Sequence, residues 1–571
     1  MNKTYWQENY RGIFKNHKWL ISLAINSVIL VAILLLTDLS YETNDDYAIA
    51  QEIVAGYPYV GFVNYYLCKI LISAQGYVAN INIFMLSQIL ASYIAFVVLM
   101  KVYINRAERS SEIILATLIC GFFSFDHYSC LQFTKTASIL MIAGLLWAVD
   151  NYVNERKTIP FIAAFLLYYI GVAYRQKGMF PAIAYAGIFV MLWLMQNKTQ
   201  LLKKERFAKE LCLLLFMLVV LIIPYGIDKV SDAKNAETPE LEYARDYQAE
   251  RVLVTDYPLM DYESNRDRYD EVGINELDLF LIDRWILDYD GAASIENLRA
   301  INEINRPYVK TRMTAIKAVK QTAKGILSYV HRRSFSGMHI IILIALTIFY
   351  LCSYQSKSWG YIFAIGTLTI AIYIAIHYMQ RAQYRALYIA EASAAFWILY
   401  AAIRAENRKK RPIKMIALCL TITTIAFMVR PAIHKLEERC KKNSAAVESE
   451  AILNYYNNHK DMFFVVPTTI AGMPKAYEDP LAIPETLVNV TDTGGWDTLT
   501  PYRIDALKKC GGINNPIKDL VNNPKGVYVG SYKLKEMTDY YNKWYSKEGT
   551  TIEFVKFDRV DDLDLYKVIV K

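Results

Sequence analysis

The acidic residues best placed to do chemistry stand together near the start of the chain. Residues 41–47 read YETNDDY, so Glu42, Asp45 and Asp46 lie within five positions. A carboxylate here can take a proton from an acceptor hydroxyl. Two adjacent carboxylates can also help to hold a divalent cation such as Mg²⁺ or Mn²⁺. The same stretch can instead cap and stabilise the start of a helix, and the two roles are compatible.

Basic residues form the second candidate group. We expect them at the outward ends of membrane spans, at Lys135, Arg175, Lys177, Arg381 and Arg385. Arginine is the better bidentate partner of phosphate, and the i,i+4 spacing of Arg381 and Arg385 places both on one face of a helix. We therefore predict that Lys135, Arg175, Arg381 and Arg385 bind a donor phosphate. The alternative is that each extends to lipid headgroups.

Glu42 and three further residues are candidates for supporting roles. Glu391 lies inside an apolar block, where an ionisable side chain is costly and usually paired. It could orient Arg385, line a donor pocket or form a structural pair. Asp126, beside His127, could complement the acid pair, and His377 is expected at the membrane interface.

The composition identifies the elements that must position these residues. Hydrophobic residues make up 54% of the 571, charged residues only 21%, and the mean hydropathy is +0.17. The apolar residues fall in blocks of about 15–20, the length that crosses a bilayer. This pattern excludes a soluble enzyme, a disordered chain and a disulfide-rich secreted module. The net charge, 63 − 55 = +8, does not imply a nucleic-acid partner.

Eleven membrane spans are predicted, with approximate centres at residues 28, 92, 118, 141, 167, 187, 219, 346, 369, 394 and 421. One set of connecting loops carries about 21 Lys and Arg residues and the alternate short loops about six. The positive-inside rule then places the N-terminus in the cytoplasm and the C-terminus outside. We therefore expect a multi-pass protein of the plasma membrane, with the short apolar segment Phe62–Ala74 lying at the outer surface.

The expected architecture has two parts. Residues 1–430 form an all-α polytopic membrane module with outward loops at 38–80 and 228–335, and residues 431–571 form a small extracytoplasmic α/β domain. Strand-like runs at Met462–Pro467, Gly526–Val529, Thr551–Phe557 and Leu565–Val570 indicate its sheet. Within this domain, Gly494-Gly495-Trp496 is interpreted as a turn with an anchoring tryptophan, or as a sugar-stacking element.

Several energy-coupling and metal motifs are absent from the sequence. There is no G-x-x-x-x-G-K-[ST] nucleotide P-loop, no H-E-x-x-H and no paired C-x-x-C. Any reaction must therefore be driven by an already activated substrate or by an ion gradient.

The acid pair in the first outward loop of a many-span protein resembles the GT-C superfamily of membrane glycosyltransferases. The wider pattern is similar to bacterial multi-span proteins of surface-polysaccharide assembly: QFTKTA at 132–137, Arg175, the stretch Asn265–Trp285 and the turn 494–496. The resemblance implies a polyprenyl-phosphate sugar donor, a surface glycan or lipid acceptor, and membrane lipids as partners. It carries over residue by residue only to Asp45 and Asp46, as the catalytic pair.

Two alternatives remain open at this stage. A surface-polysaccharide polymerase or ligase would keep the basic residues but place its key residues, such as Arg268, in the 228–335 loop. A lipid-linked glycan transporter without chemistry would need charged residues lining a path through the membrane. Glu391 is the main candidate for such a residue.

Overall fold

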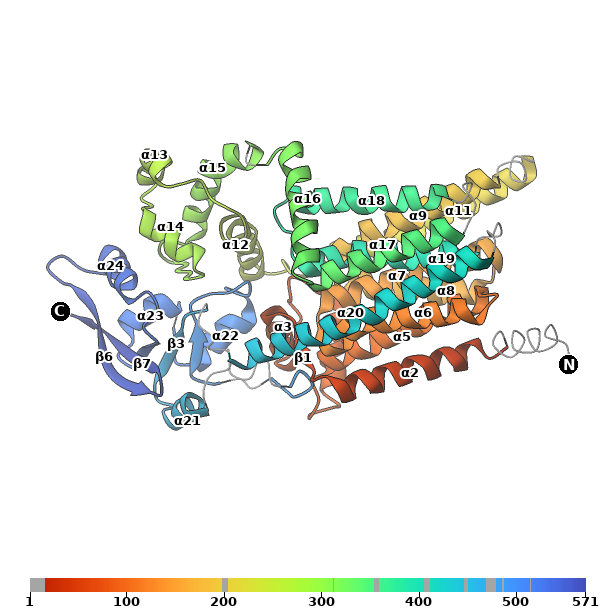
Figure 1. Ribbon diagram of the computed structural model, residues 1–571. Coiled ribbons are helices and arrows are strands. Elements are labelled where there is room, and N and C mark those ends of the chain that lie inside the picture. The colour runs from red at the N-terminus through yellow and green to blue at the C-terminus, as the bar shows by residue number, and fades with distance from the viewer. Residues whose placement is uncertain are drawn as a thin grey trace.

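The computed structural model describes residues 16–197, 204–311, 313–353, 359–404, 411–445, 450–468, 479–484, 487–513 and 515–571. A bundle of long helices forms one end of the molecule and a small α/β domain the other, with a group of shorter helices beside that domain (Figure 1). This arrangement confirms the predicted fold class.

Within the described residues, nine helices are long and apolar enough to cross a membrane. They are α2 (Lys18–Leu36), α5 (Ile83–Arg106), α7 (Phe133–Asn154), α9 (Met179–Gln196), α11 (Lys204–Lys234), α17 (Phe335–Ser353), α18 (Trp359–Tyr378), α19 (Tyr384–Arg404) and α20 (Arg411–Ala445). Helix α6 (Ser110–Ser129) and the shorter apolar α8 (Thr158–Tyr174) complete the bundle. Each of the eleven predicted centres lies in one of these helices.

Helices α7 and α19 form the centre of the bundle. In each, 94% of the most apolar window is buried inside the protein, against 17% in α2 and 11% in α11. Glycines allow α8 to pack closely on α7: a Cβ added at Gly144 would lie 2.6 Å from the Ala164 carbonyl oxygen, and one at Gly171 2.8 Å from that of Ala137. Such small residues let helix backbones approach in a membrane, where packing drives association.

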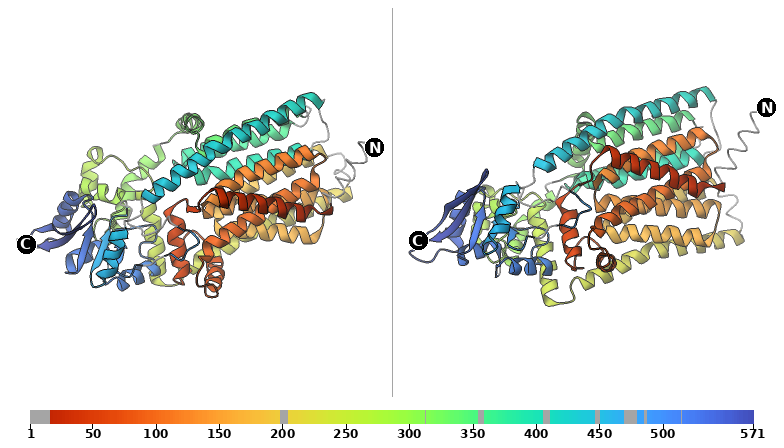
Figure 2. Two further views of the ribbon diagram at one scale, coloured as in Figure 1. Left: turned by 60° about the horizontal axis from the view of Figure 1, so that its bottom comes forward. Right: turned by 90° about the horizontal axis from the view of Figure 1, so that it is seen from below.

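The first outward loop lies over the end of the bundle that faces the α/β domain (Figure 2). Its strand β1 (Ser40–Tyr41) pairs in parallel with β2 (Cys130–Leu131), which fixes the start of α3 (Asn44–Val54) beside α7. Helix α4 (Tyr65–Gln75) is only 11 residues long and begins at an Asn64 cap. It corresponds to the short surface segment predicted at 62–74.

The large outward loop is helical. It contains α12 (Pro239–Thr255), η2 (Glu263–Asn265), α13 (Arg266–Glu271), α14 (Glu276–Asp283), α15 (Ile295–Thr311) and α16 (Ala315–His331). Its apolar side chains share one hydrophobic core with the C-terminal domain, in which Leu287 and Leu298 join Phe463 and Tyr541. The loop and the domain therefore form one continuous body outside the bundle.

The C-terminal sheet has the order β4-β3-β5-β7-β6, in which β4, β3 and β5 are parallel and β7 and β6 antiparallel. Its elements are α21 (Glu450–Asn458), β3 (Phe463–Val466), β4 (Val490–Asp492), α22 (Pro501–Lys509), α23 (Pro516–Asn522), β5 (Gly526–Val529), α24 (Leu534–Trp544), β6 (Ile552–Val560) and β7 (Leu563–Val570). Helix α20 continues through Pro431 to Ala445, so one helix runs across residue 430, where the sequence predicted the boundary between the two parts.

The carboxyl ends of the parallel strands dock on the large loop. The Leu287 N–H donates to the Thr493 carbonyl oxygen over 2.9 Å, and the Thr493 hydroxyl donates to the Trp285 carbonyl oxygen over 3.2 Å. Gly494 has a φ of +151°, and a Cβ there would lie 2.8 Å from the Leu287 side chain. Glycine therefore permits both the backbone conformation and the close contact.

Candidate active site

The two adjacent aspartates of α3 point into different surroundings. Asp46 is fully buried, and its Oδ1 accepts hydrogen bonds from Gln88 Nε2 over 3.1 Å and from the Phe133 backbone N–H over 2.9 Å. These bonds join α3 to α5 and α7. Burial is the main cause that raises the pKa of Asp46 to about 7, and the neighbouring Asp45 raises it further.

Asp45 faces the basic residues of the bundle end. Its Oδ2 lies 3.2 Å from Arg385 Nη1, and its side chain keeps 18% of its surface exposed. Burial raises the pKa of Asp45 above its ordinary value even though Arg385 and Arg175 act in the opposite direction. The structure therefore brings together Asp45 and Arg385, which lie far apart in the sequence and come from α3 and α19.

Arg175, Arg381 and Arg385 form the arginine cluster around Asp45. Arg381 makes an ion pair with Asp256 at the end of α12, and its guanidinium lies 5.3 Å from the Tyr257 ring centroid. Burial, followed by the nearby Arg385, lowers the pKa of Arg175 to about 10, so its guanidinium stays charged at neutral pH. All three arginines were predicted to bind phosphate. They come from the α8–α9 connection, the α18–α19 connection and the first turn of α19, and they lie near one another.

Arg175 differs from the other two arginines in its contacts. Its guanidinium lies 4.8 Å from the Phe62 ring centroid and 5.5 Å from that of Phe133. Within the described part of the chain the guanidinium makes no hydrogen bond or ion pair, although the side chain is half-buried. A half-buried guanidinium with unused N–H donors is suited to binding an anion.

The fourth predicted phosphate-binding residue, Lys135, is fully buried in a network of its own. Its Nζ lies 2.6 Å from Glu42 Oε2 and 2.7 Å from Asp126 Oδ2, and it donates to the Cys130 carbonyl oxygen over 2.8 Å. The Tyr384 hydroxyl also donates to Asp126 Oδ2 over 2.7 Å. The supporting residues Glu42 and Asp126 are thus placed around Lys135, and phosphate binding by Lys135 stays a prediction.

Glu391 is paired inside the bundle. Its Oε2 lies 2.6 Å from His339 Nδ1, and its Oε1 accepts from the Tyr373 hydroxyl over 2.5 Å. The contact shown for Arg385 is with Asp45 rather than with Glu391. His377 lies one turn beyond Tyr373, with its Nδ1 2.9 Å from the Tyr373 carbonyl oxygen.

An apolar groove follows the same helices toward the arginine cluster. It encloses about 350 Å³ between α17, α18 and α19, and Ile326 of α16 also lines it. Tyr373, which bonds to Glu391, is part of its wall. Arg381 lies in the connection between α18 and α19, so two of the helices that line the groove lead directly to the cluster.

Two residues of the site come from the large loop and were not predicted. Arg251 of α12 lies 3.7 Å from Asp256, which pairs with Arg381. Their signal in the sequence is weak, because charged residues are common throughout 228–290 and the default expectation there is solvation.

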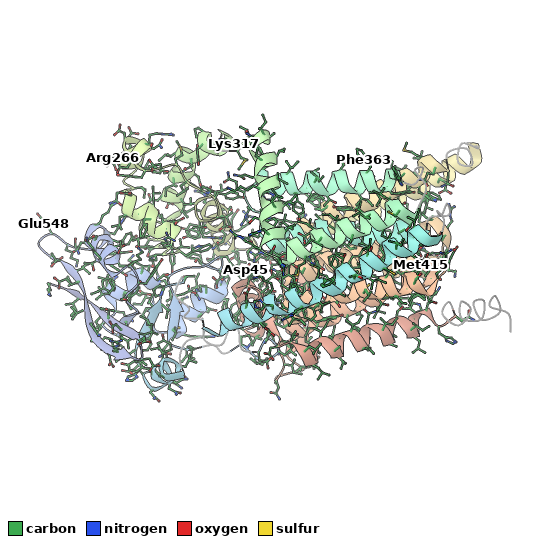
Figure 3. All side chains as sticks on the ribbon, in the orientation of Figure 1. Asp45, Arg266, Lys317, Phe363, Met415 and Glu548 are labelled. Carbon is green, nitrogen blue, oxygen red and sulfur yellow. The ribbon has the colours of Figure 1, made fainter. Side chains whose placement is uncertain are left out.

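Arg268, the residue named for the polymerase alternative, belongs to α13, and Figure 3 shows its helix neighbour Arg266 well away from Asp45.

The oxygen atoms of the acid pair are largely engaged by protein groups, which bears on whether the pair fits a divalent cation. Asp46 Oδ1 already accepts two hydrogen bonds, and Asp45 pairs with an arginine. Among the described residues, no group of three His, Cys, Asp or Glu side chains could hold a metal ion. The donor set does not fit a metal site, and we derive no step through a cation; dependence on Mg²⁺ or Mn²⁺ stays a prediction.

Comparisons with known proteins give one structural neighbour. No family model matches the chain, and no curated protein matches it. Among solved structures, the chain is similar to ArnT from Cupriavidus metallidurans in the apo state, a GT-C glycosyltransferase, over 96% of this chain and 97% of that one. The identity is 10% and the TM-score 0.35. At these values the similarity carries no argument about the reaction.

Proposed function

We propose that this membrane protein is a glycosyltransferase that moves a sugar from a polyprenyl phosphate to a glycan or lipid acceptor at the outer face. One observation carries the proposal: a carboxylate of raised pKa, Asp45, lies against Arg385 within a cluster of three arginines at the end of the bundle. A base beside a phosphate-binding group is what transfer from a sugar phosphate requires.

The reaction follows from these two parts of the site. Asp45 takes the proton from the acceptor hydroxyl while the hydroxyl oxygen attacks the anomeric carbon of the donor. The bond between that carbon and the phosphate oxygen breaks, and the phosphate leaves with the bonding electrons. The arginine cluster stabilises the charge that develops on it, and Arg175 supplies the unused donors. A single displacement of this kind inverts the anomeric carbon.

Asp46 is a positioning residue in this scheme. Its Oδ1 is occupied by Gln88 and by the Phe133 backbone N–H, so it fixes the first turn of α3 on α5 and α7. Asp45, the next residue of the same turn, is thereby held toward Arg385. Because Asp46 is buried and hydrogen-bonded, Asp45 is the carboxylate of the pair that we assign as the base.

The apolar groove supports a lipid-linked donor. Its wall consists of span residues such as Ile344, Ile348 and Ile370, each about half exposed at the outside of the bundle. A polyprenyl chain could lie along this wall, with its phosphate at Arg381 and Arg385. The lipid tail would then stay in the bilayer while the sugar projects toward Asp45.

The proposal is tested by surface-glycan composition. Mass spectrometry would compare a strain that lacks the gene with the same strain carrying wild type or Asp45→Asn, at matched membrane levels. We expect one sugar decoration to disappear in the deletion strain, to return with wild type and to stay absent with Asp45→Asn. Full restoration by Asp45→Asn would refute the proposed role of Asp45. If Arg268→Ala then removed the decoration, the polymerase alternative would be favoured.

A further inference from the structure

A partly open cavity of about 200 Å³ lies where the bundle, the large loop and the C-terminal domain meet. Three separate parts of the chain contribute its walls. The first outward loop contributes Tyr59 and Phe62, and the turn after β4 contributes Trp496. The α11–α12 region contributes Asn235, Gln248 and Arg251. The Gly-Gly-Trp turn of the C-terminal domain thus contributes to a site formed jointly with the membrane module.

The cavity combines aromatic faces with a small volume. The rings of Phe62 and Trp496 are 4.7 Å apart between centroids, at an interplanar angle of 52°, and Trp496 is only half-buried. An engineered cavity of about 150 Å³ is known to hold a benzene ring, so this volume suits one six-membered ring. Aromatic walls with a few fixed polar groups are typical of small-molecule sites.

One polar atom of the cavity residues lacks a partner. Asn235 Oδ1 is buried and accepts no hydrogen bond from the described residues. A buried acceptor of this kind is unfavourable unless a ligand or water donates to it. Gln248 is already engaged, because its Nε2 donates to the Thr498 carbonyl oxygen over 2.6 Å and its Oε1 accepts from Arg251 Nε over 2.7 Å. The side of the wall formed by Gln248 and Arg251 is therefore fixed, and the acceptors for a ligand hydroxyl are Asn235 and the exposed carboxylate of Asp232.

The cavity lies next to the arginine cluster on two sides. Phe62 in its wall contacts the Arg175 guanidinium at 4.8 Å. Arg251, also in its wall, pairs with Asp256, and Asp256 pairs with Arg381. A molecule in the cavity would therefore be separated from Arg175 by the Phe62 side chain, and from Arg381 by the side chains of Arg251 and Asp256.

We propose that this cavity binds one pyranose ring of the acceptor, which makes the acceptor a saccharide. That the bound sugar belongs to the acceptor rests on the proposed function. That the cavity binds a sugar does not depend on it. The apolar C–H face of the ring would lie against Trp496 and Phe62, a ring hydroxyl would donate to Asn235 Oδ1, and the attacking hydroxyl would point past Phe62 toward Asp45.

Binding can be measured without transfer. The probes are methyl glycosides of glucose, galactose, mannose, rhamnose, N-acetylglucosamine and N-acetylgalactosamine, added to the full-length protein in detergent and followed by saturation-transfer difference NMR. We expect at least one glycoside to bind wild type. Trp496→Ala should weaken that binding about tenfold or more, since it removes a whole stacking face. Asn235→Leu should weaken it several-fold, because it removes one hydrogen-bond acceptor.

Phe557→Ala is the matched control, since Phe557 is an aromatic residue of the same domain, on β6, with 37% of its surface exposed. It should bind as wild type does. If Trp496→Ala does not fold, Asn235→Leu still tests the cavity. The inference is overturned if no glycoside binds wild type, or if both cavity variants bind as well as wild type. Wild-type transfer by Asp45→Asn would instead overturn the proposed reaction and leave the sugar site standing.

Discussion

Replacing Asp45 with asparagine removes a charge and a base while keeping the shape of the side chain. The contact with Arg385 is a 3.2 Å pair in which both side chains are partly exposed, at 18% and 27%. Such a pair contributes about 0–1 kcal/mol to stability. The variant should therefore fold and accumulate like wild type, which allows a loss of activity to be assigned to chemistry.

The expected loss of rate follows from the role of a general base. A positioned base contributes about 10²–10⁴-fold, which corresponds to roughly 3–5 kcal/mol in the activation barrier. The raised pKa of Asp45 favours this role, because a carboxylate with a higher pKa is a stronger base near neutral pH. The rate should also fall as the pH drops through this raised pKa, since protonated Asp45 cannot accept the proton.

The assay is the initial rate at which the deletion strain regains its sugar decoration after expression is induced. Asp46→Asn is the matched control, because asparagine offers the same Oδ1 acceptor to Gln88 and to the Phe133 N–H. We expect Asp45→Asn to be slower by at least about 10² and Asp46→Asn to stay within roughly tenfold of wild type. The reverse order would show that the base is Asp46, and equal, wild-type rates would show that neither carboxylate is a base.

Three further predictions concern single side chains. The pKa of Asp46 is about 7 in the folded protein, against an ordinary 3.8. Protonation of Asp46 therefore stabilises the folded state: the contribution, up to about 4 kcal/mol, is fully present below pH 4 and is lost as the pH rises to 7. Asp46→Asn should flatten that dependence in thermal unfolding at pH 5 and pH 8; an unchanged slope would contradict this origin. Lys135→Met leaves Glu42 and Asp126 without their buried cation and should destabilise the protein by about 3–5 kcal/mol, seen as a lower unfolding midpoint; a stable variant with weakened donor affinity would instead favour a phosphate role. Arg175→Ala should reduce transfer by about 10²–10³ at nearly unchanged stability, with partial recovery in Arg175→Lys, whose ammonium keeps the charge but not the bidentate geometry; wild-type transfer by the alanine variant would exclude Arg175 from phosphate binding.

The membrane architecture was predictable from the sequence because apolar blocks of span length are a strong signal. All eleven predicted centres lie in helices of the bundle, and the strand at Gly526–Val529 was predicted with the bounds that the structure has. Short elements were missed, among them β4, α22 and α23, because three to nine residues carry little periodicity.

The pairing of residues in the site was not predictable. Asp45 and Arg385 belong to α3 and α19, and no spacing rule relates positions that distant. Arg251 and Asp256 were overlooked because a charged helix in a polar loop usually faces solvent. The shared core of the large loop and the C-terminal domain was also hidden, since it depends on which apolar faces meet after folding.

The route by which the sheet is completed has a consequence for biosynthesis. Trp496 follows β4, and the sheet that holds this turn includes β7, whose residues up to Val570 pair with β6. During synthesis, Asp45 is made long before Arg385, and the cavity wall is complete only after the last strands have been made and have folded. The contact between Asp45 and Arg385 and the cavity are therefore both absent during most of translation. Truncation of a few residues at the end of β7 should act on the site through the sheet, although those residues touch none of its charged groups.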